Sequence, residues 1–153
     1  MKTWLFTWNP NNYKWDDQIY GYKELRKDIS QTGCAFGKWS CGVNKSICKG
    51  DRIFLIRLGA NARGIVASGF AETGVFEGSH WDLQKAAEGA VTRRIYIRFD
   101  KILNIDADEL LPYEKLQYID HHYHWSPQGS GVSIPDDTAT RLEIHWKTYR
   151  CSI

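Results

Sequence analysis

The segment GKWSCGVNKSICKGDRIFLI, residues Gly37–Ile56, joins a tight turn to a strongly apolar run. The pair Gly50-Asp51 is the turn signal. After it, Ile53–Leu58 is apolar on both faces except at Arg57. This pattern is typical of a central strand that is buried on both sides. The segment therefore predicts the core of a β-sheet.

Earlier in the same segment, Trp39 stands before three small residues, Ser40, Cys41 and Gly42. A Trp ring is usually buried in the core. Small neighbours on a loop, however, leave room beside the ring for another flat group. The residues alone therefore leave two interpretations of Trp39 open, a core ring or one wall of a binding pocket.

The composition indicates a single globular domain over residues 1–153, since a chain of this length can bury roughly two thirds of its unfolded surface. Aromatic residues make up 14% of the chain, with seven Trp and eight Tyr, which is more than a core needs. The formal net charge is only +2. Any binding of nucleic acid must therefore depend on a local basic surface, because the overall charge supplies little attraction.

Cysteine and histidine spacing argues against a structural metal, and no cofactor is expected. The four cysteines contain no C-x-x-C pair, and His121, His122 and His124 have no carboxylate or Cys at a ligand-like spacing. The N-terminal apolar run is too short for a signal peptide or a membrane span. We therefore expect a cytoplasmic protein with reduced thiols and no membrane association.

Periodicity predicts short strands and helices in a mixed order. In the first strand, the face with Trp4, Phe6 and Trp8 is expected to be the strongly apolar one. Asp16 is the expected N-cap of the first helix, and Gly33 its stop. The expected strands are Lys2–Trp8, Ile53–Leu58, Gly64–Ala71 and Val91–Phe99, and the expected helices are Asp16–Ser30 and the segments that follow Pro112 and Pro135.

Two glycines inside the third expected strand, Gly64 and Gly69, indicate bends or close backbone approach, which curl a sheet toward a barrel. In Val91–Phe99 the alternation places Arg94 and Arg98 on an outward, basic face. Together the elements predict an α+β fold, a small curved and mostly β core flanked by helices.

Several short segments, taken in order, resemble one known family. They are TWLFTWNP, KWSCG, KGDRIFLIRLG, RGIVASGFAE, SHW and HWSPQGSGVSIPDD. Their order and spacing are similar to those of EVE domains, which have a PUA-like fold related to YTH domains, and most of all to the EVE domains joined to HNH nucleases in modification-dependent restriction enzymes. The resemblance covers essentially the whole chain. It implies a PUA-like barrel that accepts a flipped nucleobase in an aromatic cage.

The resemblance also implies candidate base-binding residues. Trp39 falls in the segment of the family's first cage tryptophan, and Trp81, in the loop FEGSHWD, is the expected opposing wall. By contrast, Trp4 and Trp146 are assigned to the core, because they lie on the apolar faces of a strand and a helix. The remaining candidates are edge readers and further aromatic walls, namely Ser40, Cys41, Asn9, Trp8 and Trp125.

Duplex binding also needs contacts to phosphates, because the backbone supplies most of the affinity. A solvated charged face explains each basic candidate equally well, so the prediction concerns the group and not its single members. The candidates for backbone contacts are Lys38, Lys45, Arg63, Arg94, Arg98, Gln128 and Ser130.

We therefore expect a non-enzymatic reader of a modified base in duplex DNA, either a C5-modified cytosine or a methylated adenine. The chain carries no HNH segment, so a nuclease is expected in a separate domain or partner. Two alternatives stay open. One is a YTH-like reader of modified RNA. The other is a small ASCH-like enzyme acting on nucleic acid or nucleosides, in which His121, His124, Glu72 and Asp82 would form an acid–base set.

Overall fold

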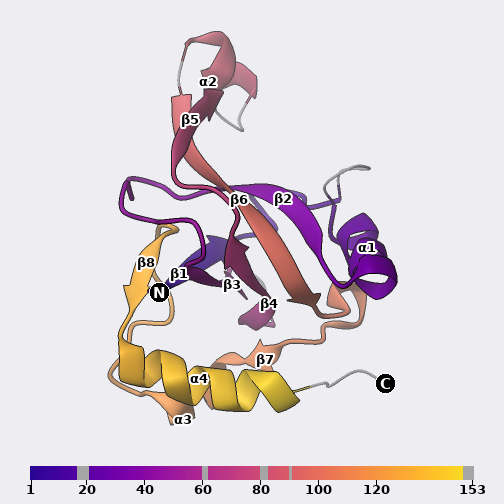
Figure 1. The fold of residues 1–153 in the computed structure, drawn as a ribbon, viewed down its shortest axis with the longest axis vertical. Helices are drawn as coiled ribbons and strands as arrows, with labels where there is room; N and C mark the ends of the chain where they lie inside the picture. Colours follow the sequence, from indigo (N-terminus) through magenta and orange to yellow (C-terminus); the bar gives the residue numbers. More distant parts are fainter. Residues whose placement is uncertain (17–20, 60–61, 80–82, 90, 150–153) are drawn as a thin grey trace.

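The computed structural model describes residues 1–16, 21–59, 62–79, 83–89 and 91–149. In these ranges a curved mixed sheet is packed between helices, which is the predicted α+β class (Figure 1). The helices are α1 (Tyr22–Thr32), α2 (Leu83–Ala87), α3 (Tyr113–Ile119) and α4 (Asp136–Thr148), with a 3-10 turn η1 (Ile105–Ala107). None of the described helices has the length and apolar character needed to cross a membrane.

The described strands form one sheet in the order β2-β6-β4-β3-β1-β8, with β5 added to β6 and β7 added to β4. Strands β1 and β3 run parallel, and the other pairs are antiparallel. The bounds are β1 Thr3–Trp8, β2 Ala35–Ser40, β3 Arg52–Arg57, β4 Gly64–Ala71, β5 Phe76–Ser79, β6 Val91–Ile102, β7 Leu111–Pro112 and β8 Val132–Ile134. The four strands expected from the sequence are confirmed as β1, β3, β4 and β6, whereas β2, β5, β7 and β8 were not predicted.

The first helix begins later than the sequence indicated. It starts at Tyr22, with Gly21 as its N-cap, so the prediction that Asp16 caps it is wrong. The Tyr22 backbone N–H, at the start of the helix, donates to the Trp15 carbonyl at 3.2 Å. Gly33 ends the helix with a φ of 90°, as predicted. The other two expected helices are confirmed as α3 and α4.

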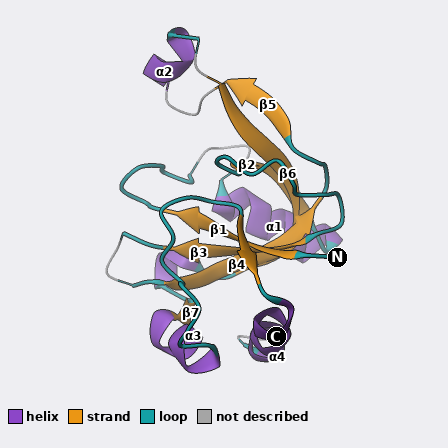
Figure 2. Cartoon of the chain, turned by 90° about the vertical axis from the view of Figure 1, so that its left-hand side faces the viewer, coloured by secondary structure: helices purple, strands orange, loops and turns teal. Residues whose placement is uncertain are grey.

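The sheet is buried on both faces. One core lies between the sheet and α1 and contains Trp4, Phe6 and Trp8. The other lies beneath α3 and α4 and contains Leu5 and Trp146. Figure 2 shows α1 on one side of the strands and α3 and α4 on the opposite side. The expectation that only one face of β1 is strongly apolar is therefore corrected, because α3 and α4 cover the other face as well.

The glycines of β4 permit close approach of neighbouring backbone, as predicted. A side chain at Gly69 would place its Cβ 2.5 Å from the Arg98 carbonyl oxygen, and one at Gly64 would collide with the Leu111 carbonyl. The register of β4 shifts against both β3 and β6. Such irregularities increase strand twist and bend the sheet, and they curve it around the core that contains Trp8.

Helix α4 is fixed to the sheet by a buried cation. The Arg52 side chain is 7% exposed and pairs with Glu143 of α4 at 2.8 Å and with Asp100 of β6 at 3.0 Å. Ser68 bonds to the same Asp100 carboxylate and accepts the indole N–H of Trp146. These contacts link three strands to the helix through hydrogen bonds, not through packing alone.

Strands β5 and β6 form a hairpin that extends away from the rest of the fold together with α2 (Figures 1 and 2). Its β5 strand was expected to be part of the loop FEGSHWD, but Phe76–Ser79 pair with β6. The alternation predicted for β6 is confirmed, because Ile95 and Ile97 are buried. Trp81, the second expected cage wall, lies outside the described residues.

Candidate functional site

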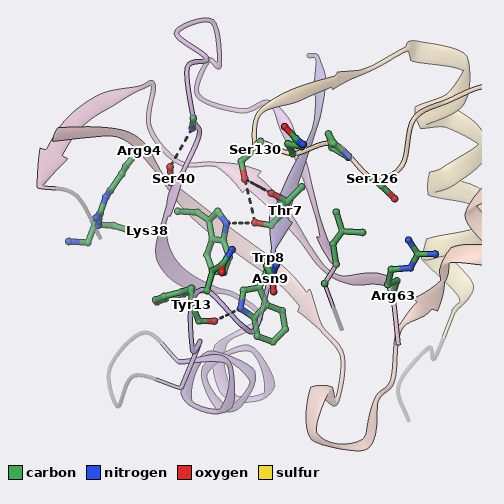
Figure 3. A pocket seen from close by; sticks show the side chains of 18 of the residues that line it. Thr7, Trp8, Asn9, Tyr13, Lys38, Ser40, Arg63, Arg94, Ser126 and Ser130 are labelled. Atoms are coloured by element: carbon green, nitrogen blue, oxygen red, sulfur yellow. Dashed lines mark hydrogen bonds between the residues drawn. The ribbon is translucent and has the colours of Figure 1, made fainter. Parts of the chain in front are cut away.

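A pocket of about 990 Å³ opens where the path of the sheet does not close, between β1 and β2 (Figure 3). Its volume is at the upper end of the range typical of ligand sites, roughly 300–1,000 Å³. The lining comes from the end of β1 and the turn after it, from β2, from the β5–β6 hairpin and from the loop 126–130. Of the predicted site residues, the lining includes Trp8, Asn9, Lys38, Trp39, Ser40, Arg63, Arg94, Gln128 and Ser130.

Trp39 forms part of the pocket wall but lies in a strand. The expected loop position is corrected, because Trp39 is the fifth residue of β2 and its side chain is 7% exposed. Its indole N–H donates to the Thr7 carbonyl at 3.2 Å across the gap between β1 and β2. The rings of Trp15 and Tyr13 meet it edge to face, with centroids 4.9 Å and 5.6 Å away. Trp39 is therefore a core ring that presents a small part of its surface to the pocket.

Trp8 and Tyr13 continue this aromatic wall. The indole N–H of Trp8 donates to the Tyr13 carbonyl at 2.8 Å, which holds the turn after β1 against the sheet. Trp8 is 5% exposed, whereas Tyr13 is only partly buried and lines the pocket. Sequence reasoning missed Tyr13. An aromatic residue within the polar turn NPNNYKW, directly after a strand, is the signal that could have identified it.

A pair of hydroxyls lies beside the aromatic wall. Strand β8 stops pairing with β1 at Leu5. Beyond that point, the backbone N–H of Thr7 donates to the Ser130 hydroxyl at 3.0 Å, and the two hydroxyl oxygens are 3.2 Å apart (Figure 3). Ser130 was a predicted contact and Thr7 was not. Both hydroxyls line the pocket and can exchange one of their mutual bonds for a bond to a ligand.

The predicted edge readers fall into two groups. Ser40 and Asn9 line the pocket. The Ser40 hydroxyl lies 3.2 Å from that of Thr92, and the Asn9 side-chain oxygen accepts the Asn11 backbone N–H, as expected of a turn former. Cys41 is fully buried outside the lining, and its burial raises the pKa of the thiol. In this structure Cys41 is part of the core.

Three of the predicted cations meet at the pocket, and two do not. Lys38 and Arg94 lie on one side, and Arg63 lies on the opposite side (Figure 3). Lys45 is exposed outside the lining. Arg98 lies further along β6, where it pairs with Glu72 at 3.5 Å. The sheet therefore separates Arg94 and Arg98, although the sequence placed them on one face.

Trp125 belongs to the core beneath α3 and α4. Its side chain is 1% exposed, and its indole N–H donates to the Asp120 carbonyl at 2.9 Å. The Tyr123 ring packs edge to face against it. Trp125 is not among the residues that line the pocket. From its sequence, Trp125 could equally be a further aromatic wall or a core residue, and the structure favours the core.

The described lining of the pocket carries no Asp, Glu, His or Cys. Of the acid–base set considered for an enzyme, Glu72 pairs with Arg98 of β6 and His121 packs on the ring of His122, while Asp82 lies outside the described residues. Within the described ranges, no group of three or more His, Cys, Asp or Glu residues is arranged to hold a metal ion. The pocket chemistry described is thus aromatic, hydroxylic and cationic.

Comparison with known proteins finds solved structures of similar fold. No family model and no curated protein sequence matches the chain. A Pseudomonas syringae protein superposes with a TM-score of 0.62 at 13% identity, covering 93% of this chain and 97% of its own. Human THYN1, solved in complex with DNA containing 5-methylcytosine, gives 0.59 at 10% identity over 100% of both chains. An ASCH protein from Zymomonas mobilis gives 0.50 at 10% identity, covering 93% and 96%.

The chain has a PUA-like fold. Its curved mixed sheet and flanking helices match those of the THYN1 and ASCH structures, so the predicted fold class is confirmed. At identities of 10–13%, a structural likeness establishes the fold and not the function.

Proposed function

We propose that this chain reads a modified nucleobase in DNA, which it holds, flipped out of the duplex, in the pocket between β1 and β2. One observation carries the proposal. The pocket combines an aromatic wall and uncharged hydrogen-bonding groups with cations at its margin. A flipped base needs flat apolar contacts and partners for its edge, and the adjoining phosphates need positive charge.

The likeness to human THYN1 supports the same proposal. That protein was solved with 5-methylcytosine DNA, and it matches this chain over its full length. A C5-modified cytosine is therefore the first ligand to test, and a methylated adenine is the second. The aromatic cage itself is part of the proposal, because Trp39 and Trp8 are largely buried and the partly exposed rings of the described lining are those of Tyr13 and Phe76.

The chemistry of the pocket suits a base-binding protein better than an enzyme. Hydrolysis of a nucleic acid or nucleoside commonly uses a carboxylate, His or Cys near the reacting atom. The described lining supplies none of these groups. The ASCH structure shares the fold, so activity on acylated nucleosides and RNA remains the matching assay. Turnover of either substrate by the purified chain would favour the enzyme.

The wider role that we propose is recognition within a modification-dependent restriction system, with cleavage supplied by a separate nuclease domain or partner. The isolated chain should then bind DNA without cutting it. Supercoiled plasmid incubated with the protein and Mg²⁺ should stay intact. Nicking that is lost on changing His122 or His124 would contradict this role for the chain.

Binding is tested with fluorescein-labelled duplexes that differ at one position, which carries cytosine, 5-methylcytosine, adenine or N6-methyladenine. The dissociation constant for one modified duplex should lie well below that for its unmodified counterpart. A 2-aminopurine placed next to the modified base in the same strand should brighten on binding, because extrusion of its neighbour removes the stacking on that side. Equal affinity for all four duplexes would refute modified-base reading. Tighter binding to single-stranded RNA with the same modification would favour the RNA reader.

The variant Tyr13→Ala connects this preference to the pocket. A base stacked on an aromatic ring gains about 1–3 kcal/mol, so the variant should lose about 5- to 150-fold in affinity for the modified duplex. Tyr118→Ala is the matched control, because Tyr118 lies on α3 outside the pocket and is 78% exposed. If both variants bind alike, the ligand does not stack on Tyr13.

A further inference from the structure

We propose that Arg63, Tyr113 and Ser126 form a phosphate-binding site at the end of the pocket opposite Lys38 and Arg94. This inference rests on the proposed function, because it identifies the groups that would bind the DNA backbone where the DNA strand leaves the pocket. The ligand class is a phosphodiester of the strand that carries the base. A nucleotide held inside the strand would then be bound through both of its flanking phosphates, one at each end of the pocket.

Arg63 differs in its partners from the ion-paired arginines of the fold. Within the described residues, Arg63 makes no ion pair, and it is exposed at the pocket margin. Four other arginines pair with a carboxylate, namely Arg52, Arg57, Arg98 and Arg141. A guanidinium without a carboxylate keeps its donors available for an anion.

Tyr113 holds this guanidinium in place. The central carbon of the Arg63 guanidinium lies 4.2 Å from the centroid of the Tyr113 ring. The backbone N–H of Tyr113 also donates to the Arg63 carbonyl at 2.9 Å. A guanidinium stacked on a ring directs its N–H groups sideways in one plane, which suits two oxygens of a phosphate. Tyr113 is therefore a positioning residue for Arg63.

Ser126 completes the site from the loop before β8. Its hydroxyl donates to the phenol oxygen of Tyr113 at 2.8 Å. The proton of the Tyr113 phenol is then left to donate to an acceptor other than Ser126. Arg63 and Ser126 both line the pocket, and Figure 3 shows them together on one side, with Lys38 and Arg94 across from them. Arg63 and Ser126 are far apart in the sequence, and the fold brings them to one end of the pocket.

The size of the pocket agrees with a ligand longer than one base. A volume of about 990 Å³ equals that of about 33 water molecules at roughly 30 Å³ each. This is more than a single pyrimidine ring occupies, so the pocket has room for the base together with its sugar and adjoining phosphates. Cations at both ends then match the charges at both ends of such a unit.

The test neutralises one phosphate at a time. Short duplexes with one 5-methylcytosine, and the matching duplexes with cytosine, carry an uncharged methylphosphonate on either the 5′ or the 3′ side of that base. Their single-stranded forms are titrated in parallel. Affinities are measured by fluorescence anisotropy for the wild type, Arg63→Gln, Tyr113→Phe and Lys115→Gln. Lys115 is the matched control, because it lies over the ring of Tyr118, outside the pocket.

Arg63→Gln should weaken binding about 10- to 150-fold, the range expected for hydrogen bonds to a charged group. One of the two methylphosphonates should weaken wild-type binding by a similar factor and have no effect in Arg63→Gln, because coupled partners are not additive. The other methylphosphonate should remain costly in that variant and lose its effect in Lys38→Gln/Arg94→Gln. Tyr113→Phe keeps the ring but not the phenol, and it should lose less affinity than Arg63→Gln.

The outcomes separate this site from the proposed function. Coupling of Arg63 to one phosphate without any preference for 5-methylcytosine would leave the phosphate site standing and refute modified-base reading in favour of general strand binding. A clear preference for 5-methylcytosine, with Arg63→Gln no weaker than Lys115→Gln, would overturn the phosphate site alone. Failure of the wild type to bind any of these strands would overturn both.

Discussion

Replacing Trp39 by alanine should destabilise the protein before it affects recognition. The side chain is 7% exposed, packs against Trp15 and Tyr13, and bonds to the Thr7 carbonyl. Truncating a buried Trp to Ala costs about 3–5 kcal/mol. The entropy of unfolding near the melting temperature is about 2.1 cal/mol/K per residue, or about 0.3 kcal/mol/K for this chain. The melting temperature should therefore fall by about 10–15 °C.

Calorimetric melting of three variants tests this magnitude. Trp4→Ala is the matched control, because Trp4 is 6% exposed, donates its indole N–H to buried Asp51 and lies outside the pocket. It should melt as low as Trp39→Ala. Leu83→Ala, at an exposed position of α2, should melt with the wild type. A fall of less than about 3 °C for Trp39→Ala would refute the assignment of this ring to the core.

Binding then separates the two buried tryptophans. Trp39→Phe keeps a flat ring but removes the donor to the Thr7 carbonyl, which should cost about 1 kcal/mol of stability. Assayed at a temperature where all variants are folded, Trp39→Phe should weaken binding of 5-methylcytosine DNA, because it changes the pocket wall. Trp4→Phe should bind like the wild type. Equal binding by both Phe variants would show that Trp39 acts through stability alone.

Three further outcomes follow from the structure. Arg52→Ala should cost about 1.5–3 kcal/mol in chemical denaturation, since it removes the charge-assisted hydrogen bonds from this buried guanidinium to the partly exposed Asp100 and Glu143 carboxylates; an unchanged midpoint would refute this. Burial of the Asp51 carboxyl acts to raise its pKa, but hydrogen bonds from the Cys48 and Lys2 amides and the Trp4 indole hold that pKa below its ordinary value. This stabilisation is present above the unfolded pKa of about 3.9 and is lost as the pH falls through the folded pKa, so Asp51→Asn should be less stable than wild type at pH 7 and should flatten the acid limb of the stability curve. Finally, affinity for DNA should fall with salt at a slope that corresponds to about two to five phosphate contacts, and a slope near zero would exclude a nucleic-acid backbone as ligand.

Local pattern was sufficient for most of the long elements. Strand β3 is apolar on both faces, and α4 follows a Pro with two acidic residues in its first turn; these signals need no information from elsewhere in the chain. The missed strands are short, or their inward and outward residues differ little in polarity. In β2 the buried residues Ala35, Gly37 and Trp39 alternate with exposed Phe36, so small inward residues and an apolar outward one conceal the period of two.

The role of Trp39 could not be obtained from its neighbours in sequence. A large ring beside small residues suits a pocket wall and a core position equally well, because both surround one flat face with apolar contacts. The difference arises from Trp15 and Tyr13, which lie before α1 and fold back onto the ring. Contacts between such distant segments are not encoded in the local pattern around Trp39.

The charges illustrate the same division. The alternation in β6 placed Arg94 and Arg98 on one outward face, and this much follows from the period of a strand. The fold then separates them, because Arg94 lies in the part of β6 that pairs with β5 beside the pocket, whereas Arg98 lies next to Glu72 further along the sheet. Sequence periodicity fixes the direction of a side chain, but the pairing of strands and the packing of loops fix what that side chain meets.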